Sequence, residues 1–181
     1  MPDLSSNSRK FLLALARESI RCHLESGDWP GIPAHDKEIE ITRGCFVTLH
    51  KKGELRGCVG TFDASKPLVE NVKRMAVAAA FQDSRFSPVT KSELGEIHIE
   101  ISVLGPLVKM NSLEELVIGR HGVYVKLGAR SGTFLPEVAV EQKWSREEFL
   151  MWCARHKAGL NVDEISKAEV YLYEVEKFGE S

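Results

Sequence analysis

The hydrophobic residues of this chain recur with two spacings, one typical of helices and one typical of strands. Between residues 8 and 25 they return every three or four positions, as on the buried face of an amphipathic helix. Between residues 96 and 104 they alternate with polar residues, as in a strand that buries one face. Both patterns occur again further along the chain.

Applied to the whole chain, these spacings predict helices and strands in mixed order. The longer helices are predicted over 8–25, 65–81 and 146–156, with short helical turns after Thr90, Ser112 and Leu135. Strands are predicted over 45–50, 54–62, 96–104, 121–126, 130–135 and 168–178. Because no βαβ unit of regular length repeats, we expect an α+β fold with mixed or antiparallel sheets and helices.

Two of the predicted strands are separated only by Lys51-Lys52-Gly53 and therefore form a β-hairpin. With a three-residue loop, Thr48 pairs with Arg56 and Phe46 pairs with Cys58. A bulge at the glycine of the loop would shift this register by one residue. Alternation of side chains then places Arg56 and Cys58 on one mostly polar face.

The octapeptide Leu55–Phe62 carries the clearest candidate chemistry. It places Arg56 two residues from Cys58 and sets Gly57 and Gly60 beside them. A positive charge next to a thiol lowers the thiol pKa, which favours a reactive cysteine. Glycines also let backbone N–H groups or a ligand approach closely. The alternative is an ordinary strand whose glycines only permit tight packing.

Composition and charge narrow the class of protein. Of the 181 residues 43% are hydrophobic and 28% are charged, which is typical of a globular domain rather than a disordered chain. The formal net charge of −2 argues against nucleic-acid binding through bulk positive charge. We expect a cytoplasmic protein without a membrane segment, because residues 1–7 do not resemble a signal peptide and no apolar run is long enough to span a bilayer.

The four cysteines support neither a disulfide framework nor a metal motif. Cys22, Cys45, Cys58 and Cys153 include no C-x-x-C pair and no zinc-ribbon spacing. The chain also lacks a glycine-rich dinucleotide motif and a P-loop. The sequence therefore predicts no cofactor and contains no local metal motif, which leaves a metal site assembled in space from cysteines and histidines as the alternative.

Taken with three later stretches, the octapeptide resembles the AMMECR domain family, also called protein A of the AmmeMemoRadiSam system. The matching stretches follow the order of the family and are Leu55–Phe62, Asp83–Phe86, His121-Gly122, and Leu135–Ala139 followed by Glu141-Gln142 and Trp144. Val59 stands where isoleucine is common, which changes packing slightly. Lys143 stands where the family often has glycine, which puts a turn in doubt.

The resemblance implies one domain over residues 1–181, built from two unequal lobes with both termini in the larger. It also implies a cleft between the lobes near the cysteine stretch. Members of the family are associated with a Memo-like protein and a radical SAM protein, which are therefore the expected partners. The substrate, a small molecule or a protein, is not named by the resemblance.

Two functions fit these residues. In the first, the protein is an enzyme with Cys58 as nucleophile, Arg56 stabilising the thiolate or binding an anionic substrate, and His121 as general base or acid. Backbone N–H groups near Gly57 and Gly60 would stabilise an oxyanion. In the second, the same surface belongs to a non-enzymatic module that binds a partner or carries a ligand.

The remaining matched residues are assigned to substrate binding or orientation. They are Asp83, Arg85 and Glu137. On the sequence alone, a local ion pair in a solvated turn is favoured for the aspartate and the arginine. The alternative for His121 is a turn or capping histidine. We predict that Arg56, Cys58, Asp83, Arg85, His121 and Glu137 converge on one concave surface between the lobes.

Overall fold

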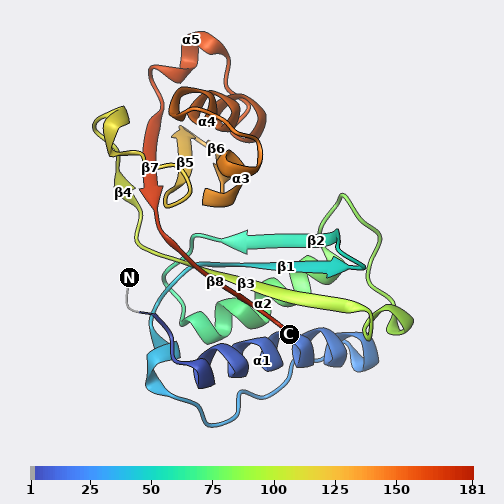
Figure 1. The fold of residues 1–181 in the computed structure, drawn as a ribbon. Helices are drawn as coiled ribbons and strands as arrows, with labels where there is room; N and C mark the ends of the chain where they lie inside the picture. Colours follow the sequence, from blue (N-terminus) through green and yellow to red (C-terminus); the bar gives the residue numbers. More distant parts are fainter. Residues whose placement is uncertain (1–2) are drawn as a thin grey trace. The chain divides into compact units, whose positions relative to one another are not determined.

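The chain is divided between two structural units, shown with the rest of the fold in Figure 1. The computed structural model describes residues 3–181. Unit 1 consists of Met1–Leu104 and Glu176–Ser181, and unit 2 consists of Gly105–Val175. Each unit contains its own cluster of buried hydrophobic residues. The chain therefore leaves unit 1 once and returns to it once.

Unit 1 is built on a four-stranded sheet in the order β2-β1-β3-β8. Its strands are β1 (Cys45–Lys51), β2 (Glu54–Thr61), β3 (Ile97–Leu104) and β8 (Val175–Gly179). Two long helices, α1 (Ser6–Ser26) and α2 (Leu68–Phe81), cover one face of this sheet (Figure 1). Two short helical turns, η1 (Lys37–Glu40) and η2 (Lys91–Glu93), lie in the connections.

The core of unit 1 follows the hydrophobic pattern of the sequence. In β3 the four alternating residues Ile97, Ile99, Ile101 and Val103 are all buried against the helices. In α2 the apolar residues that recur at helical spacing form a buried stripe. They are Leu68, Val72, Met75, Ala76 and Ala79. Helix α1 begins after a capping Ser5 and ends at Gly27, whose φ of 76° is left-handed. The helices and strands predicted from periodicity are therefore confirmed in this unit.

The β1–β2 hairpin has a different register from the one predicted. Its turn contains two residues, Lys52 and Gly53, with φ of 54° and 84°, the conformation that suits the twist of a hairpin. The ladder pairs Thr48 with Cys58 and is shifted by a bulge between Leu49 and His50. Arg56 is the extra residue, because its neighbours on β2 pair with these two residues of β1.

Unit 2 is a smaller sheet in the order β4-β7-β5-β6 with short helices. Its strands are β4 (Val108–Lys109), β5 (Gly122–Leu127), β6 (Arg130–Phe134) and β7 (Glu169–Tyr173). Its helical segments are η3 (Leu113–Glu115), α3 (Pro136–Glu141), α4 (Arg146–Trp152), the π-helical turn η4 (Cys153–Lys157) and α5 (Val162–Ile165). Phe149 and Cys153 anchor the helices in the core of this unit.

The last predicted strand, 168–178, is two strands in the structure. Residues up to Tyr173 form β7 in the sheet of unit 2, and the chain continues after Glu174 as β8 in the sheet of unit 1. Alternation continues through both, so a local pattern does not reveal the change of sheet. With its two antiparallel sheets and helices, the protein has the predicted α+β class.

Candidate functional site

Cys58 is held in place from its side chain and from its main chain. Its Sγ accepts a hydrogen bond from the hydroxyl of Thr48, at 3.3 Å. Its N–H donates to Oδ2 of Asp83 at 2.9 Å, and its carbonyl accepts from Nη2 of Arg85 at 3.4 Å. Because β2 is an edge strand, Asp83 and Arg85 satisfy peptide groups that the sheet itself leaves open.

The Asp83–Arg85 pair is more than the local ion pair of a solvated turn. Nε and Nη2 of Arg85 donate to the two carboxylate oxygens of Asp83 at 2.9 and 2.7 Å, a bidentate arrangement. The Asp83 side chain is only 6% exposed, whereas that of Arg85 is 52% exposed. The guanidinium of Arg85 is the main cause that holds the pKa of Asp83 well below its usual range. The backbone N–H groups of Cys58 and Arg85 lower this pKa further.

Burial raises the pKa of the half-buried Cys58 thiol above its usual value. The Thr48 hydroxyl and the positive charge of Arg85 act in the opposite direction, and the carboxylates of Asp83 and Glu100 add to the increase. The lowered pKa expected from the sequence is therefore wrong. The reason is physical: removal from water disfavours the thiolate more than the nearby donor and cation favour it.

Arg56 does not supply the charge that acts on the thiol. Its Nε and Nη2 contact the two carboxylate oxygens of Glu93 at 3.1 and 3.2 Å, and Nη2 also donates to the Pro88 carbonyl. The same carboxylate contacts Lys51 at 3.0 Å. Arg56 lies at the bulge of β2, and Arg85 is the arginine whose charge lowers the pKa of Cys58.

The two glycines beside Cys58 serve close packing within the protein. A Cβ on Gly57 would lie 2.2 Å from the carbonyl oxygen of Ala79 in α2, and one on Gly60 would lie 2.2 Å from the ring of Phe46. The packing alternative therefore accounts for Gly57. Gly60 has a second property: because backbone groups alternate in direction along a strand, its N–H points to the same open edge as that of Cys58. Binding of substrate at either glycine remains a prediction.

His121 and Glu137 belong to unit 2. Nδ1 of the half-buried His121 accepts a hydrogen bond from the N–H of Val117 at 3.1 Å, as a turn histidine does. The following Gly122 makes room for a ring, since a Cβ there would lie 2.4 Å from Tyr173. Glu137 is half-buried near the start of α3. Convergence of these two side chains with Cys58 remains a prediction.

The sequence did not single out Thr48 or Glu100 as site residues. On the face of the sheet that carries Cys58, the ladder pairs Thr48 with Cys58 on one side and with Glu100 on the other. Nζ of Lys177 continues this row at 2.8 Å from Glu100. The predicted register opposed Thr48 to Arg56 and so hid the contact. A two-residue turn, recognised from Lys52-Gly53, would have brought the pairing closer to the observed one.

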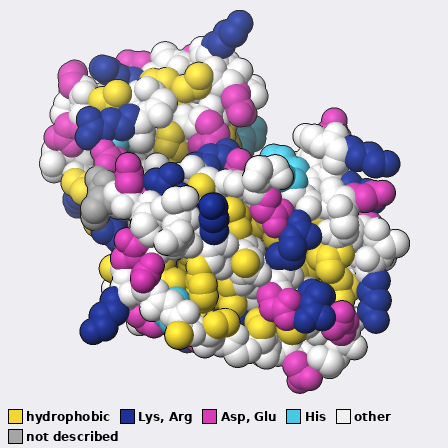
Figure 2. Space-filling view, turned by 60° about the horizontal axis from the view of Figure 1, so that its bottom comes forward, with side chains coloured by type: hydrophobic (Ala, Val, Ile, Leu, Met, Phe, Trp, Pro, Cys, Tyr) yellow, Lys and Arg dark blue, Asp and Glu magenta, His cyan; other side chains and the backbone are white. Residues whose placement is uncertain are grey.

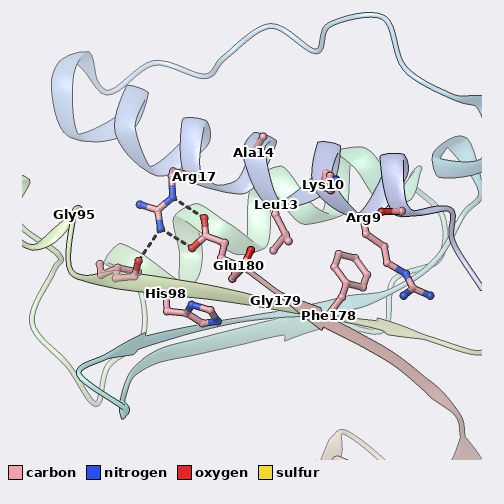
Figure 3. A pocket seen from close by; sticks show the side chains of 13 residues that line it. Arg9, Lys10, Leu13, Ala14, Arg17, Gly95, His98, Phe178, Gly179 and Glu180 are labelled. Carbon is pink, nitrogen blue, oxygen red and sulfur yellow. Dashed lines mark hydrogen bonds and ion pairs between the residues drawn. The ribbon is translucent and has the colours of Figure 1, made fainter.

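A groove of about 750 Å³ lies elsewhere in unit 1, along α1 and the C-terminal residues (Figure 3). Arg17 closes one part of it: its guanidinium contacts Glu180 through Nε and Nη2 and donates to the carbonyls of Leu94 and Ile97. Lys10 and His98 also line the groove. Arg17 therefore ties the C-terminal residues to α1.

The surface carries charges of both signs. On the face drawn in Figure 2, acidic and basic side chains are interspersed, with hydrophobic side chains exposed between them. Within residues 3–181, no three His, Cys, Asp or Glu side chains gather as ligands for a metal ion. None of the helices described for these residues has the length and apolar character needed to cross a bilayer.

The fold and the site define an α+β protein with a thiol on an edge strand, where an Asp–Arg pair holds its peptide groups. The AMMECR1 family model matches residues 13–178. The chain therefore belongs to the AMMECR1 family, and the resemblance seen in the sequence is confirmed.

Several archaeal proteins of similar length are relatives of this chain. Protein MK0488 of Methanopyrus kandleri is 42% identical over 188 residues, covering 98% of this chain and 90% of the relative. Protein NEQ441 of Nanoarchaeum equitans is 37% identical over 179 residues, covering 93% and 98%. The crystal structure of the uncharacterized protein PH0010 from Pyrococcus horikoshii matches with a TM-score of 0.90 and 34% identity, covering 97% of this chain and 93% of the other.

Proposed function

We propose that the protein is an enzyme that uses Cys58 as a nucleophile. The observation that carries this proposal is the fixed position of the thiol, with a hydroxyl donating to Sγ and a cation nearby that both favour the thiolate. Because the pKa of the thiol is raised, a base is needed to ionise it at neutral pH. His121 is the residue that we assign to this role, on the family resemblance. Its Nδ1 accepts the N–H of Val117, so this hydrogen bond has to break before the ring can take the proton of the thiol.

In the proposed reaction the base takes the proton of the thiol, and the thiolate attacks an electrophilic carbon of the substrate. A covalent Cys58 intermediate forms, and its leaving group departs with that proton. Water then releases the product and restores the thiol. Arg85 and the N–H of Gly60 stabilise the negative charge that develops, while Asp83 and Glu137 orient the groups around it. Arg56 has a positioning role through Glu93.

The pathway belongs to the proposal as well. Family resemblance supports a cytoplasmic pathway that includes a Memo-like protein and a radical SAM protein, with a small molecule or a protein as substrate. No cofactor of this chain is assigned to the reaction, and neither nucleic acid nor a membrane is proposed as a partner.

Mass spectrometry of the intact protein tests the nucleophile. The wild type, Cys58→Ser and Cys22→Ser are each incubated with a small-molecule extract of cells, and covalent adducts are followed over time. We expect an adduct in the wild type and in Cys22→Ser that disappears as the substrate is consumed, and none in Cys58→Ser. An adduct that persists unchanged in Cys58→Ser would contradict the assignment of the nucleophile.

The second function is a module that binds a partner or carries a ligand and catalyses no reaction. The raised pKa of Cys58 favours it, because it keeps the thiol protonated at neutral pH. Under this function, binding to the Memo-like or radical SAM protein depends on the surface but not on the thiolate. Calorimetric titration with each purified partner distinguishes the two. Equal affinity for the wild type and Cys58→Ser, together with no turnover of any adduct, favours the module.

A further inference from the structure

Arg85 is held on one side of its guanidinium. Nε and Nη2 contact Asp83, and Nη2 also donates to the carbonyl of Cys58. For Nη1, the structure of residues 3–181 shows no hydrogen bond or ion pair. The guanidinium also lies over the ring of Phe86, with its central carbon 5.4 Å from the ring centroid, and half of the Arg85 side chain is exposed. Two N–H donors therefore remain for a ligand.

The charge of Asp83 is already distributed over several donors. Oδ1 accepts from the backbone N–H and Nε of Arg85, and Oδ2 accepts from Nη2 of Arg85 and the N–H of Cys58. Since the carboxylate is buried beneath these donors, it fixes the guanidinium without covering its outer edge. The N–H groups of Nη1 that remain can donate to an oxygen of an anionic group, such as a carboxylate or a phosphate.

Arg85 also contacts the residue that carries the thiol, through the nitrogen next to Nη1. Nη2 contacts the carbonyl of Cys58 itself, at 3.4 Å, and the charge of Arg85 and the thiolate act on each other. The N–H of Gly60 points to the same edge of β2. An anion at Nη1 would therefore lie next to Cys58.

We infer that the Cys58 site takes a substrate with a carboxylate or phosphate group, which Nη1 of Arg85 binds while the thiol attacks a nearby electrophilic carbon. This substrate class rests on the proposed function, because it assumes that Cys58 is the nucleophile. Arg85 is then the residue that determines specificity, and Asp83 positions it.

Two alkylating reagents of nearly equal size test the inference. Iodoacetate carries a carboxylate and iodoacetamide does not, so the ratio of their rates at one cysteine reports attraction of the anion. Cys22 is the internal control, because its Sγ faces the Glu18 carboxylate at 3.5 Å. Peptide mapping gives both rates at both thiols. We expect the iodoacetate-to-iodoacetamide ratio to be about tenfold higher at Cys58, as one charge-assisted hydrogen bond provides.

Two variants with matched ion pairs localise the effect. In Arg85→Gln the ratio at Cys58 should fall to that at Cys22. Arg130→Gln removes an ion-paired arginine of similar exposure in unit 2, with Glu164 as its partner, and should leave the ratio unchanged. Circular dichroism checks that each variant is folded. If Arg85→Gln does not fold, the wild-type ratios and the protection experiment below decide the question.

Protection by small anions identifies the group. Inorganic phosphate and acetate are added separately while wild-type Cys58 is alkylated with iodoacetate. Slower alkylation by one of them, at concentrations that leave Cys22 unaffected, supports the inference and names the group. Equal reagent ratios at the two cysteines, without protection by either anion, overturn the anionic substrate but leave the nucleophile standing. No reaction of Cys58 with either reagent overturns the proposed nucleophile and this inference with it.

Discussion

At the scale of the residue, the protonation of Cys58 depends on groups that lie on different segments. Thr48 lies opposite on β1, Arg85 follows α2, and Glu100 lies on β3. Each group moves the pKa of the thiol in a direction that its charge or hydrogen bond determines. Removing one of them should therefore move the pH at which the thiol becomes reactive.

The Thr48 hydroxyl gives the sharpest test of this dependence. Its hydrogen bond to Sγ lowers the pKa of Cys58, so Thr48→Val should raise that pKa and shift the pH–rate profile of alkylation to higher pH. Rates of iodoacetamide alkylation at several pH values, mapped by peptide, measure the shift. The profile of Cys22 serves as the control and should not move. A profile of Cys58 that moves to lower pH would show that the hydroxyl does not stabilise the thiolate.

Lys143, the residue that put a turn in doubt, does form the turn. Its φ of 56° is left-handed, a conformation that is unfavourable for a lysine but not for a glycine. Lys143→Gly should therefore increase the free energy of unfolding by about 1 kcal/mol, as measured by urea denaturation. Lys167→Gly, at a position without positive φ, is the control and should not stabilise the protein. A loss of stability in Lys143→Gly would mean that the side chain contributes more than the strain.

The sequence predicted which residues to consider but not which arginine acts on Cys58. The octapeptide and the Asp83–Phe86 stretch are recognisable as motifs, and the cysteine could be chosen from its neighbours. The assignment to Arg56 failed because one extra residue at a bulge changes the partners of every residue beyond it. The contact of Arg85 with Cys58 joins residues that are far apart in sequence, and no local pattern encodes it.

At the scale of the element, α2 lies directly against β2 because Gly57 has no side chain. A methyl group there would meet the backbone of Ala79 rather than a flexible side chain, so helix and strand must separate to accommodate it. Gly57→Ala should therefore destabilise the protein by about 1–3 kcal/mol, as measured by urea denaturation. Gly31→Ala, where nothing lies within 4 Å of the added Cβ, is the matched control. Equal stability of the two variants would show that α2 is not closely packed on this strand.

Helices and strands were predictable where one face is buried. The alternation in β3 and the apolar stripe of α2 are direct consequences of a core on one side. The division of the last predicted strand into β7 and β8 was not predictable, because each half pairs with strands distant in sequence. The end of the predicted helix 146–156 was also altered: its last turn is a π-helix, and Gly132 of β6 leaves space for that turn.

At the scale of the whole molecule, each unit has its own hydrophobic core. Phe149 is fully buried in the core of unit 2, so Phe149→Ala should lower the stability of that unit by about 3–5 kcal/mol. We expect faster amide hydrogen exchange within 105–175, measured by mass spectrometry, with residues of unit 1 less affected. Leu12→Ala, in the core of unit 1, should give the reverse pattern. Equal acceleration in both units would mean that they unfold as one cooperative structure.

The route of the chain between the units has an evolutionary consequence. Strands β3 and β8 are neighbours in one sheet, yet the whole of unit 2 separates them in sequence. Near one end of β3, the N–H of Glu180 donates to the carbonyl of Ile99. Just beyond the other end of β3, the N–H of Gly105 donates to the carbonyl of Glu174, so the two strands run in opposite directions. Unit 2 is thus an insertion within a β-hairpin, the kind of position where a protein tolerates the gain of a domain. A gene that joined Leu104 to Val175 through a short turn would retain every strand of the larger sheet, together with Cys58 and Arg85.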